Sequence, residues 1–128
     1  MALAVRKIKS GNAFSICALQ ENNRCDLVEF LSEVDDMTRA RLVRTIERIA
    51  DFGPLKNLDV VKPLGNKLFE MKISWVRIVF FYDEAKLIIC THAFRKDSQK
   101  TPKRELSRAQ SLMKLYFCRR ATEGIQFC

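Results

Sequence analysis

The chain has 128 residues, 48% of them hydrophobic and 30% charged, which suffices for one compact domain over residues 1–128 and is too short for two. Its formal net charge of +8 predicts an anionic partner, because clustered Lys and Arg gain affinity by releasing counterions from phosphates, although charge alone does not separate nucleic acid from an acidic protein. No apolar run approaches the length of a membrane span, and the N-terminal MALAVRKIKS lacks the apolar core of a signal peptide, so we expect a soluble, cytoplasmic protein without a membrane partner.

Two short strands and a helix are predicted first. Residues 2–9 and 13–19 are partly apolar runs separated by the turn-forming residues 10–12, which predicts a β-hairpin or one broken strand. Asp26 and Glu29 have the spacing of a capping box at the start of a helix. The apolar stripe of this helix consists of Leu27, Phe30, Leu31 and Val34.

A second helix is predicted to begin at Asp35 and Asp36. It is predicted to end at residues 52–54, which contain a glycine and a proline. Its core-facing side is predicted to consist of Met37, Ala40, Leu42, Ile46, Ile49 and Ala50.

Three strands are predicted after a connection over residues 55–66. Residues 68–73, 76–82 and 87–94 are rich in β-branched and aromatic residues, and residues 83–86 supply a turn between the last two runs. Antiparallel pairing follows from the short connections between these strands.

A final helix is predicted from Thr101, which can cap it, with Pro102 at its first position. Its apolar side is predicted to consist of Leu106, Ala109, Met113, Tyr116 and Phe117. The order of strands, two helices, three antiparallel strands and one helix is typical of an α+β sandwich rather than of a βαβ nucleotide-binding fold.

A row of cations is predicted across the last three strands. If two-residue loops join them at 74–75 and 84–85, Arg77 lies opposite Lys72 on one neighbouring strand and opposite His92 on the other. Like charges that face each other destabilise a sheet, so such a row is best tolerated where it binds an anion or where an acid screens it. Glu70 is the nearest acid in the sequence. The alternatives are cations that reach solvent from an uncovered face and a hydrogen-bonded structural histidine.

The stretch HAFRKDSQKTPKREL, residues 92–106, concentrates positive charge where the last strand leads into the last helix. The basic residues around this junction are Arg95, Lys96, Lys100, Lys103, Arg104 and Arg108. Cations at a helix N-terminus oppose the helix dipole, so helix stability does not account for them, whereas a bound phosphate backbone does. An ordinary solvated helix face is the alternative.

Metal and disulfide chemistry are not expected. The chain has one histidine and five cysteines without a CxxC pair, a pattern that fits neither a zinc site nor a disulfide framework. We therefore expect reduced thiols, no metal ligands and no cofactor.

Several segments are similar to one known family. RCDLVEFL, IERIADFG, KLFEMKI and VRIVFFY occur in this order, and HAFRKDSQKTPKREL is followed by SRAQ. Together they resemble, over about residues 12–117, the phage-derived, HigB-like branch of the RelE/ParE superfamily of bacterial toxin-antitoxin toxins. The resemblance implies a RelE-like α+β fold: a curved antiparallel sheet of about four to five strands, with two N-terminal helices and one C-terminal helix packed on it. It also implies an endoribonuclease that cleaves messenger RNA, usually on the ribosome, and that a cognate antitoxin, expected to be a helix-turn-helix protein, holds inactive.

The resemblance also assigns individual positions. Arg77 falls on the arginine of the family's central strand, and Lys72 falls where the family commonly has arginine. Phe94 and Lys96 fall on the phenylalanine and first lysine of the phage-type motif, and residues 100–102 fall on its Lys-Thr-Pro.

Two positions depart from the family pattern. Asp97 stands where this branch usually has a second lysine, and an acid in place of a base subtracts two charges beside the expected site. Lys72 keeps the charge of arginine but loses its bidentate fork. Either change can weaken RNA binding and cleavage.

The expected reaction is metal-independent attack of an RNA 2′-hydroxyl on the adjacent phosphorus. Arg77 is expected to stabilise the phosphate, because its guanidinium stays charged. Lys96, or His92 if it faces the site, is the candidate for proton transfer, because histidine titrates near neutrality and neighbouring cations favour the neutral form of a lysine. RNA contacts are expected from Lys72, Phe94, Arg95, Lys100, Lys103 and Arg104. For Phe94 a core position is the alternative to stacking on a base.

Two other functions stay open. The first is a ParE-type toxin, which inhibits DNA gyrase without cutting RNA; the cations Lys72, Arg77 and Lys96 favour the nuclease over it. The second is a non-catalytic module or toxin remnant that binds nucleic acid or an acidic partner, in which Asp97 marks decay.

Overall fold

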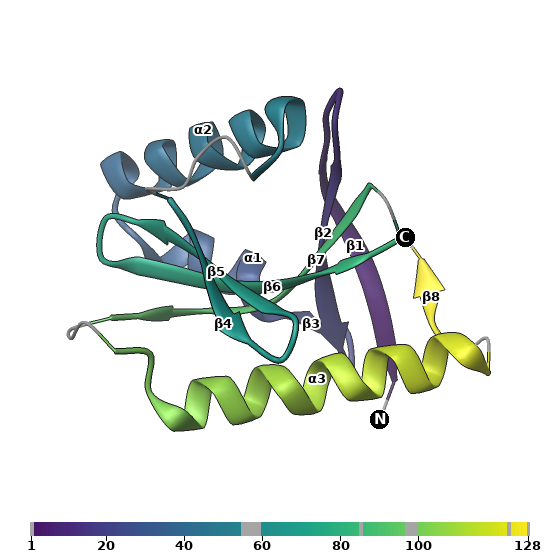
Figure 1. Cartoon of the computed structure of the whole chain (residues 1–128). Helices are drawn as coiled ribbons and strands as arrows, with labels where there is room; N and C mark the ends of the chain where they lie inside the picture. The colour runs from purple at the N-terminus through teal and green to yellow at the C-terminus, as the bar shows by residue number, and fades with distance from the viewer. Residues whose placement is uncertain (1, 55–59, 85, 97–99, 123, 128) are drawn as a thin grey trace.

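The computed structural model describes residues 2–54, 60–84, 86–96, 100–122 and 124–127. Within these ranges, eight strands form one sheet and three α-helices pack on it (Figure 1). The strands are β1 (Leu3–Ser10), β2 (Ser15–Glu21), β3 (Arg24–Cys25), β4 (Val61–Gly65), β5 (Leu68–Ile73), β6 (Val76–Asp83), β7 (Leu87–Arg95) and β8 (Gln126–Phe127). The helices are α1 (Asp26–Glu33), α2 (Asp36–Phe52) and α3 (Lys103–Ala121). Among the described residues, no helix combines the length and the apolar character needed to cross a membrane.

The sheet is mixed. Its strand order is β4-β5-β6-β7-β2-β1-β8, and β3 pairs with β2 beside this path. β2 runs parallel to β7 and β8 runs parallel to β1, whereas the other neighbours are antiparallel. The expectation of an antiparallel sheet of four to five strands with two N-terminal helices is therefore wrong: the sheet of the described residues is larger and mixed, and α1 and α2 follow three strands.

Local features of the sequence explain why β3, β4, β8 and the parallel pairing of β2 with β7 were not predicted. β4 lies inside the stretch interpreted as a connection, because Pro63 and Gly65 interrupt it, and it is an edge strand, where proline is tolerated. β3 and β8 have only two residues each. The parallel pairing of β2 with β7 joins segments far apart in the chain, so no turn between them signals it.

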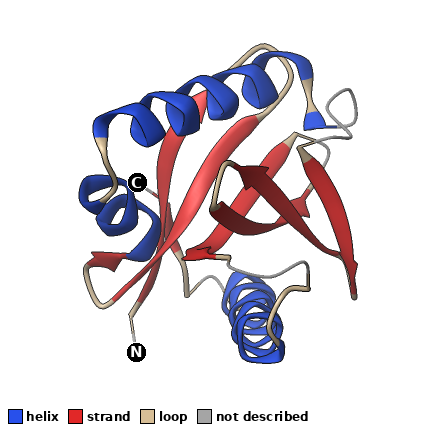
Figure 2. Cartoon of the chain, turned by 90° about the vertical axis from the view of Figure 1, so that its left-hand side faces the viewer, coloured by secondary structure: helices blue, strands red, loops and turns tan. Residues whose placement is uncertain are grey.

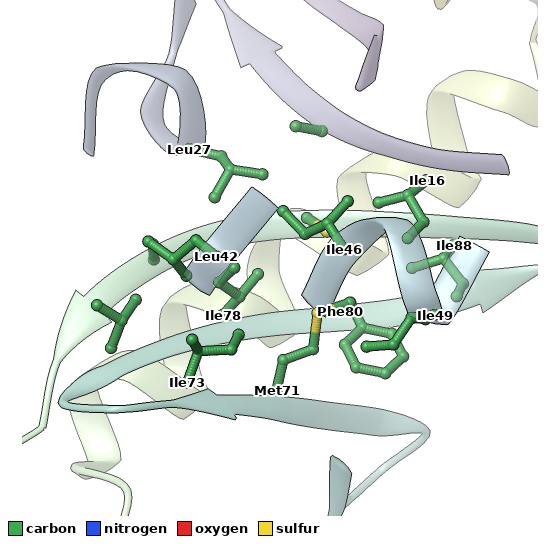
Figure 3. Packing of buried hydrophobic residues seen from close by; sticks show 14 of the residues in the cluster. Ile16, Leu27, Leu42, Ile46, Ile49, Met71, Ile73, Ile78, Phe80 and Ile88 are labelled. Atoms are coloured by element: carbon green, nitrogen blue, oxygen red, sulfur yellow. The ribbon is translucent and has the colours of Figure 1, made fainter. Parts of the chain in front are cut away.

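Both faces of the sheet are covered. Figure 2 shows α1 and α2 on one side of the strands and α3 on the other. Ile78 and Phe80 of β6 belong to the hydrophobic cluster beneath α1 and α2, part of which Figure 3 shows, whereas Val79 and Phe81 belong to the cluster beneath α3. Burial of both faces explains why residues 78–82 of β6 form a continuous apolar run rather than an alternating one.

Helix starts follow the predictions only in part. Asp35 caps α2, and its carboxylate accepts the Thr38 backbone N–H at 3.1 Å. α1 has no capping box, because Asp26 is its first residue and Cys25 occupies the cap position.

The buried side of α2 follows Leu42, Ile46 and Ile49, whereas the predicted core residues Met37 and Ala40 are exposed. A position one residue from a buried stripe is rotated about 100° away from it.

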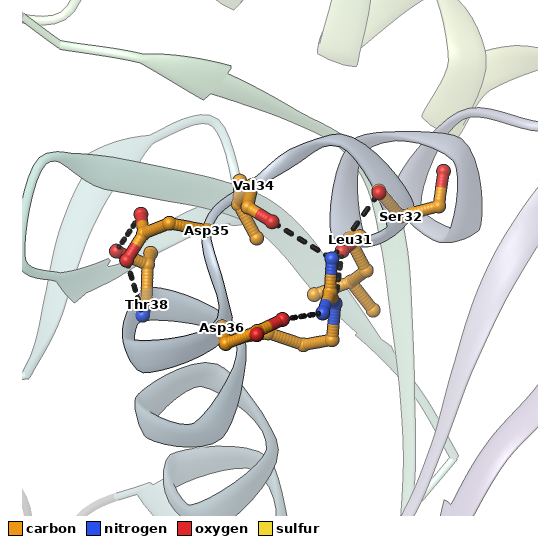
Figure 4. A network of polar contacts seen from close by, with 7 residues as sticks. Leu31, Ser32, Val34, Asp35, Asp36 and Thr38 are labelled. Carbon is orange, nitrogen blue, oxygen red and sulfur yellow. Dashed lines mark hydrogen bonds and ion pairs between the residues drawn. The ribbon is translucent and has the colours of Figure 1, made fainter.

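The corner between α1 and α2 is held by Arg39, around which Figure 4 draws the polar contacts. Its guanidinium donates to the carbonyls of Leu31 and Val34, both at 2.7 Å, and to that of Ser32 at 3.2 Å. These carbonyls belong to the C-terminal end of α1, where the helix itself supplies no donors. Arg39 also pairs with Asp36 at 2.8 Å, so one side chain fixes the end of α1 against the start of α2.

Gly11 permits the close approach of the β1–β2 turn to α2. A Cβ at this position would lie 2.4 Å from the Ala50 carbonyl oxygen, an atom that is held in place because it accepts the backbone N–H groups of Ala13 and Phe14.

We expect Gly11→Ala to lower the free energy of unfolding by about 1–3 kcal/mol in urea titrations. At Gly124 a Cβ would make only ordinary contacts, the nearest at 3.5 Å, so Gly124→Ala is the matched control and should change stability little. Equal effects of the two substitutions would contradict this account of the turn.

Candidate functional site

A buried carboxylate of β5 contacts residues from β6, from the position just after β7 and from the residues just before α3. Glu70 of β5 is 2% exposed, and its Oε1 lies 2.9 Å from Nε of Arg77 and 3.4 Å from Nζ of Lys96. Its Oε2 accepts a hydrogen bond of 2.6 Å from the Thr101 hydroxyl. We call these four residues the Glu70 cluster. Arg77 and Lys96, predicted from sequence to share one site, therefore approach the same oxygen atom.

Arg77 is held by the backbone as well as by the carboxylate. Its Nη1 donates to the carbonyls of Ser74 at 2.8 Å and Val76 at 3.0 Å. Its Nε–H is not directed at Glu70, so that contact is an ion pair without a hydrogen bond. Arg77 is only 8% exposed, and its guanidinium is fixed at the tip of the β5–β6 hairpin.

The predicted row of cations is correct on one side of Arg77 and wrong on the other. Lys72 pairs with Arg77 as predicted, but Phe94 rather than His92 lies opposite Arg77 on β7. The connection from β6 to β7 has three residues instead of two, and Thr91 is an extra residue that bulges from β7. Together they shift the pairing of β7 with β6 by two residues. His92 therefore stays on the same face of the sheet as Arg77, as predicted, but it pairs with Val79, farther from the tip of the β5–β6 hairpin.

His92 is a buried histidine beneath α3. It has no exposed surface, its Nδ1 lies 3.0 Å from the Thr91 hydroxyl, and its Nε2 lies 3.3 Å from Oε1 of Glu105 in α3. Burial lowers the pKa of His92 below its ordinary value because it disfavours the charged imidazolium, and Arg108 lowers it further against the opposing effects of Glu105 and Asp26. His92 therefore links β7 to α3 and does not reach the Glu70 cluster by any described contact.

Phe94 is also a core residue. It is 7% exposed, belongs to the hydrophobic cluster beneath α3, and lies 5.8 Å from His92 between ring centroids. Its ring is packed inside the protein instead of being presented to a base.

The remaining predicted cations lie on the surface, most of them around the Glu70 cluster. Lys72 extends from β5 beside Arg77, whereas Arg95, the last residue of β7, lies over the Trp75 ring on the opposite side of the sheet. The side chains exposed to solvent are those of Lys72, Arg95, Lys100, Lys103 and Arg104. Asp97, which the sequence comparison singled out, lies outside the described residues.

Charge in the Glu70 cluster does not balance. Among the described residues of the cluster, one carboxylate faces two cations, which leaves a surplus of one positive charge, and exposed Lys72 adds a second beside it. Little water screens a charge at this depth, so the surplus attracts an anion at the surface above it. In the described part of the chain, no group of three His, Cys, Asp or Glu side chains is placed to hold a metal ion. The arrangement therefore offers fixed cations for an anion such as a phosphate.

Sequence reasoning noted Glu70 as the nearest acid but missed its partner Thr101 and the contact of Glu105 with His92. Thr101 was expected to cap α3, yet its hydroxyl bonds to Glu70, and Pro102 occupies the cap position without a side-chain hydrogen bond. The alternation of side chains along β5 could have predicted that Glu70 belongs to this site. Glu70 lies two residues from Lys72 and therefore on the same face of the sheet.

A buried ion cluster, bordered by exposed cations, lies between the mixed sheet and the residues just before α3. Residues 29–114 match the family described as phage derived protein Gp49-like (DUF891). The match covers more than half of the chain, so the protein belongs to this Gp49-like family, a type II toxin family of the RelE/HigB-like kind. The matched range contains the whole Glu70 cluster. Among curated proteins, none matches the chain.

Removing the Glu70 charge should destabilise the fold. In Glu70→Gln two buried cations lose their counter-charge, and we expect a loss of about 3 kcal/mol in the free energy of unfolding, measured by urea titration. Adding Lys96→Met should recover part of the loss, because one unpaired charge disappears. Glu29→Gln is the control: Glu29 pairs with Arg24 at 2.8 Å on the surface, and its neutralisation should have little effect. A double variant no more stable than Glu70→Gln would contradict the assignment.

Burial of His92 should make stability depend on pH. Its pKa is lower in the folded chain than in the unfolded chain, so the unfolded state binds more protons once the pH falls below about 6.5. We expect the free energy of unfolding to fall between pH 7.5 and pH 5.5, and this fall to be smaller in His92→Gln whatever the variant's absolute stability. Urea titrations at both pH values give the difference. The same pH dependence in wild type and variant would show that His92 is not its source.

Proposed function

We propose that the protein is the toxin of a type II toxin-antitoxin pair and acts as a metal-independent endoribonuclease on messenger RNA. The observation that carries this proposal is the approach of Arg77 and Lys96 to one carboxylate oxygen, with a surplus of positive charge beneath a surface of exposed cations. Membership of the Gp49-like family supports the toxin class. A single-stranded polyanion suits such a surface better than a small anion, because exposed cations extend from β5 to the first turn of α3.

In the proposed reaction the ribose 2′-hydroxyl gives its proton to solvent water and attacks the adjacent phosphorus, while the bond from phosphorus to the 5′-oxygen breaks. The products are a cyclic phosphate and a free 5′-hydroxyl, which takes up a proton. Arg77 is assigned to the negative charge that builds on the phosphate oxygens. Its described contacts involve Nε and Nη1, and a guanidinium has five N–H donors, so further donors remain for a phosphate.

Lys96 is the proposed proton donor to the leaving 5′-oxygen. Its ammonium group is held 3.4 Å from Glu70, and its backbone N–H donates to the Trp75 carbonyl at 3.0 Å. Both the side chain and the backbone of Lys96 are therefore held in position. His92 is less suited to this role, because it is fully buried between Thr91 and Glu105. Glu70 and Thr101 are positioning residues in this scheme.

Binding of the RNA is assigned to the exposed cations Lys72, Lys100, Lys103 and Arg104, and to Arg95 on the other side of the hairpin tip. Messenger RNA on the ribosome is the proposed substrate, and a helix-turn-helix antitoxin is the proposed inhibitory partner. Both proposals come from the family resemblance. Co-expression with the antitoxin should abolish the effects of the toxin.

A second candidate is RNA binding without cleavage. It is favoured by the depth of the site, since Arg77 is 8% exposed and the Lys96 side chain 4% exposed, and both already have a carboxylate partner.

Induced expression followed by mapping of messenger RNA ends separates the candidate functions. A nuclease produces new ends inside transcripts, a gyrase inhibitor produces a DNA-damage response, and a binding module produces neither.

We expect Arg77→Lys to reduce RNA cleavage in a translating extract about 100-fold, because it keeps the charge needed by Glu70 but loses the fork that holds the phosphate. Arg77→Ala is a less specific test, because it would also leave buried Glu70 with one cation fewer. Lys114→Ala removes an exposed cation elsewhere on α3 and should cleave at the normal rate. Circular dichroism confirms folding of each variant. Normal cleavage by Arg77→Lys would remove Arg77 from the reaction.

Lys96→Arg tests proton transfer in the same extract. Arginine keeps the ion pair with Glu70 but does not release its proton near neutral pH, so we expect a single-turnover rate about 100-fold lower with unchanged RNA affinity. A lower affinity with an unchanged single-turnover rate would make Lys96 a binding residue only.

A further inference from the structure

A notch of about 370 Å³ lies between the α1–α2 corner and the tip of the β5–β6 hairpin. Trp75, at this tip, forms one wall: the Arg95 guanidinium lies 4.6 Å from its ring centroid, and the Phe30 ring lies 6.1 Å away. The α1–α2 corner forms the other wall. The notch, called the Trp75 notch below, is lined by Phe30, Glu33, Val34, Asp35, Trp75 and Arg95.

The wall opposite Trp75 is rigid and carries one free carboxylate. Arg39 fixes the corner through the carbonyls at the end of α1, and Asp35 uses both carboxylate oxygens on Thr38 (Figure 4). Glu33 is exposed and forms no ion pair with any described residue. It is therefore an unpaired acceptor of hydrogen bonds at the rim of the notch, on a backbone that Arg39 holds in place.

The Trp75 notch is adjacent to the Glu70 cluster. The Trp75 carbonyl accepts the backbone N–H of Lys96, and the Ser74 carbonyl accepts Nη1 of Arg77. Trp75 packs on the side of α1 and α2, whereas Arg77 and Lys96 reach Glu70 on the side of α3. The two places are thus on opposite sides of one hairpin tip, and a nucleic acid strand that crosses the tip contacts both.

We infer that the Trp75 notch binds a single nucleobase of the RNA, and that guanine is the base it favours. Unpaired RNA bases stack on aromatic rings and on guanidinium planes, and the Arg95–Trp75 pair provides both surfaces. Guanine carries two adjacent N–H donors on its Watson–Crick edge, and the two oxygens of the Glu33 carboxylate match them. Arg95 forms no ion pair with a described residue, so its guanidinium is available to carry the base or to move aside for it.

This inference rests on the proposed function for its RNA, but it can be tested without cleavage. Trp75 is the only tryptophan of the chain, so intrinsic tryptophan fluorescence reports on this notch alone. The probes are 2′-O-methyl RNA hexamers of uridine with one central G, A or C, or with uridine throughout, because methylation removes the attacking hydroxyl. Stacking of a base on Trp75 should quench its emission, with an affinity about tenfold higher for the hexamer that contains G.

Glu33→Gln and Lys114→Ala form the matched pair of variants. Both alter exposed residues and should fold normally. We expect Glu33→Gln to reduce the preference for G to about twofold or less, because an amide offers one acceptor where the carboxylate offers two, and Lys114→Ala to retain the preference. Equal quenching by all four hexamers would overturn the choice of guanine. An emission change with the antitoxin but with none of the hexamers would assign the notch to a protein partner and overturn the inference.

A cleavage experiment separates failure of this inference from failure of the proposed function. In a translating extract, Trp75→Ala should keep cutting but lose the base preference of the wild-type cleavage sites, and Trp75→Phe should retain it. Unchanged cleavage sites in Trp75→Ala would overturn the inference and leave the nuclease proposal intact. Absence of cutting by the wild type, together with G-dependent quenching, would overturn the nuclease and support the notch.

Discussion

The ionic contacts of one buried carboxylate determine how the sheet and α3 meet. Glu70 is placed in the interior by β5, where a charge is tolerated only with partners, and its partners come from β6, from the end of β7 and from the residue before the first turn of α3. Lys96 and Thr101 stand on either side of the segment 97–99, and both contact Glu70. The carboxylate therefore fixes both ends of the connection from β7 to α3, and with it the position of the surface cations.

The tip of the β5–β6 hairpin serves both candidate sites. Its two carbonyls receive donors from Arg77 and Lys96, which lie on the side of α3, while the ring of Trp75 points to the side of α1 and α2. In the proposed binding of RNA, the cations on one side bind phosphates in any sequence, and the aromatic ring and the carboxylate on the other side distinguish bases. A hairpin tip fixed by these contacts holds the two parts at a constant separation.

The sequence predicted local features better than distant ones. The two-residue turn at Ser74 and Trp75 placed Lys72 opposite Arg77, because a short hairpin loop determines the pairing of its strands. Pairing between β6 and β7 was not predictable in the same way, since a three-residue connection and the bulge at Thr91 carry no clear signal. The pairing of β2 with β7 and the contact of Thr101 with Glu70 depend on the whole fold. A threonine before a helix is ordinarily a cap, and here the buried carboxylate competes for its hydroxyl.

The parallel pairing of β2 with β7 also bears on when the protein becomes active during its synthesis. β2 leaves the ribosome early, but its neighbour β7 is made only after α1, α2 and four further strands, and the contact of Thr101 with Glu70 requires the residues just before α3 as well. A nascent chain therefore cannot assemble the Glu70 cluster until most of the polypeptide has emerged. Any function that depends on this cluster therefore begins only when synthesis of the chain is nearly complete.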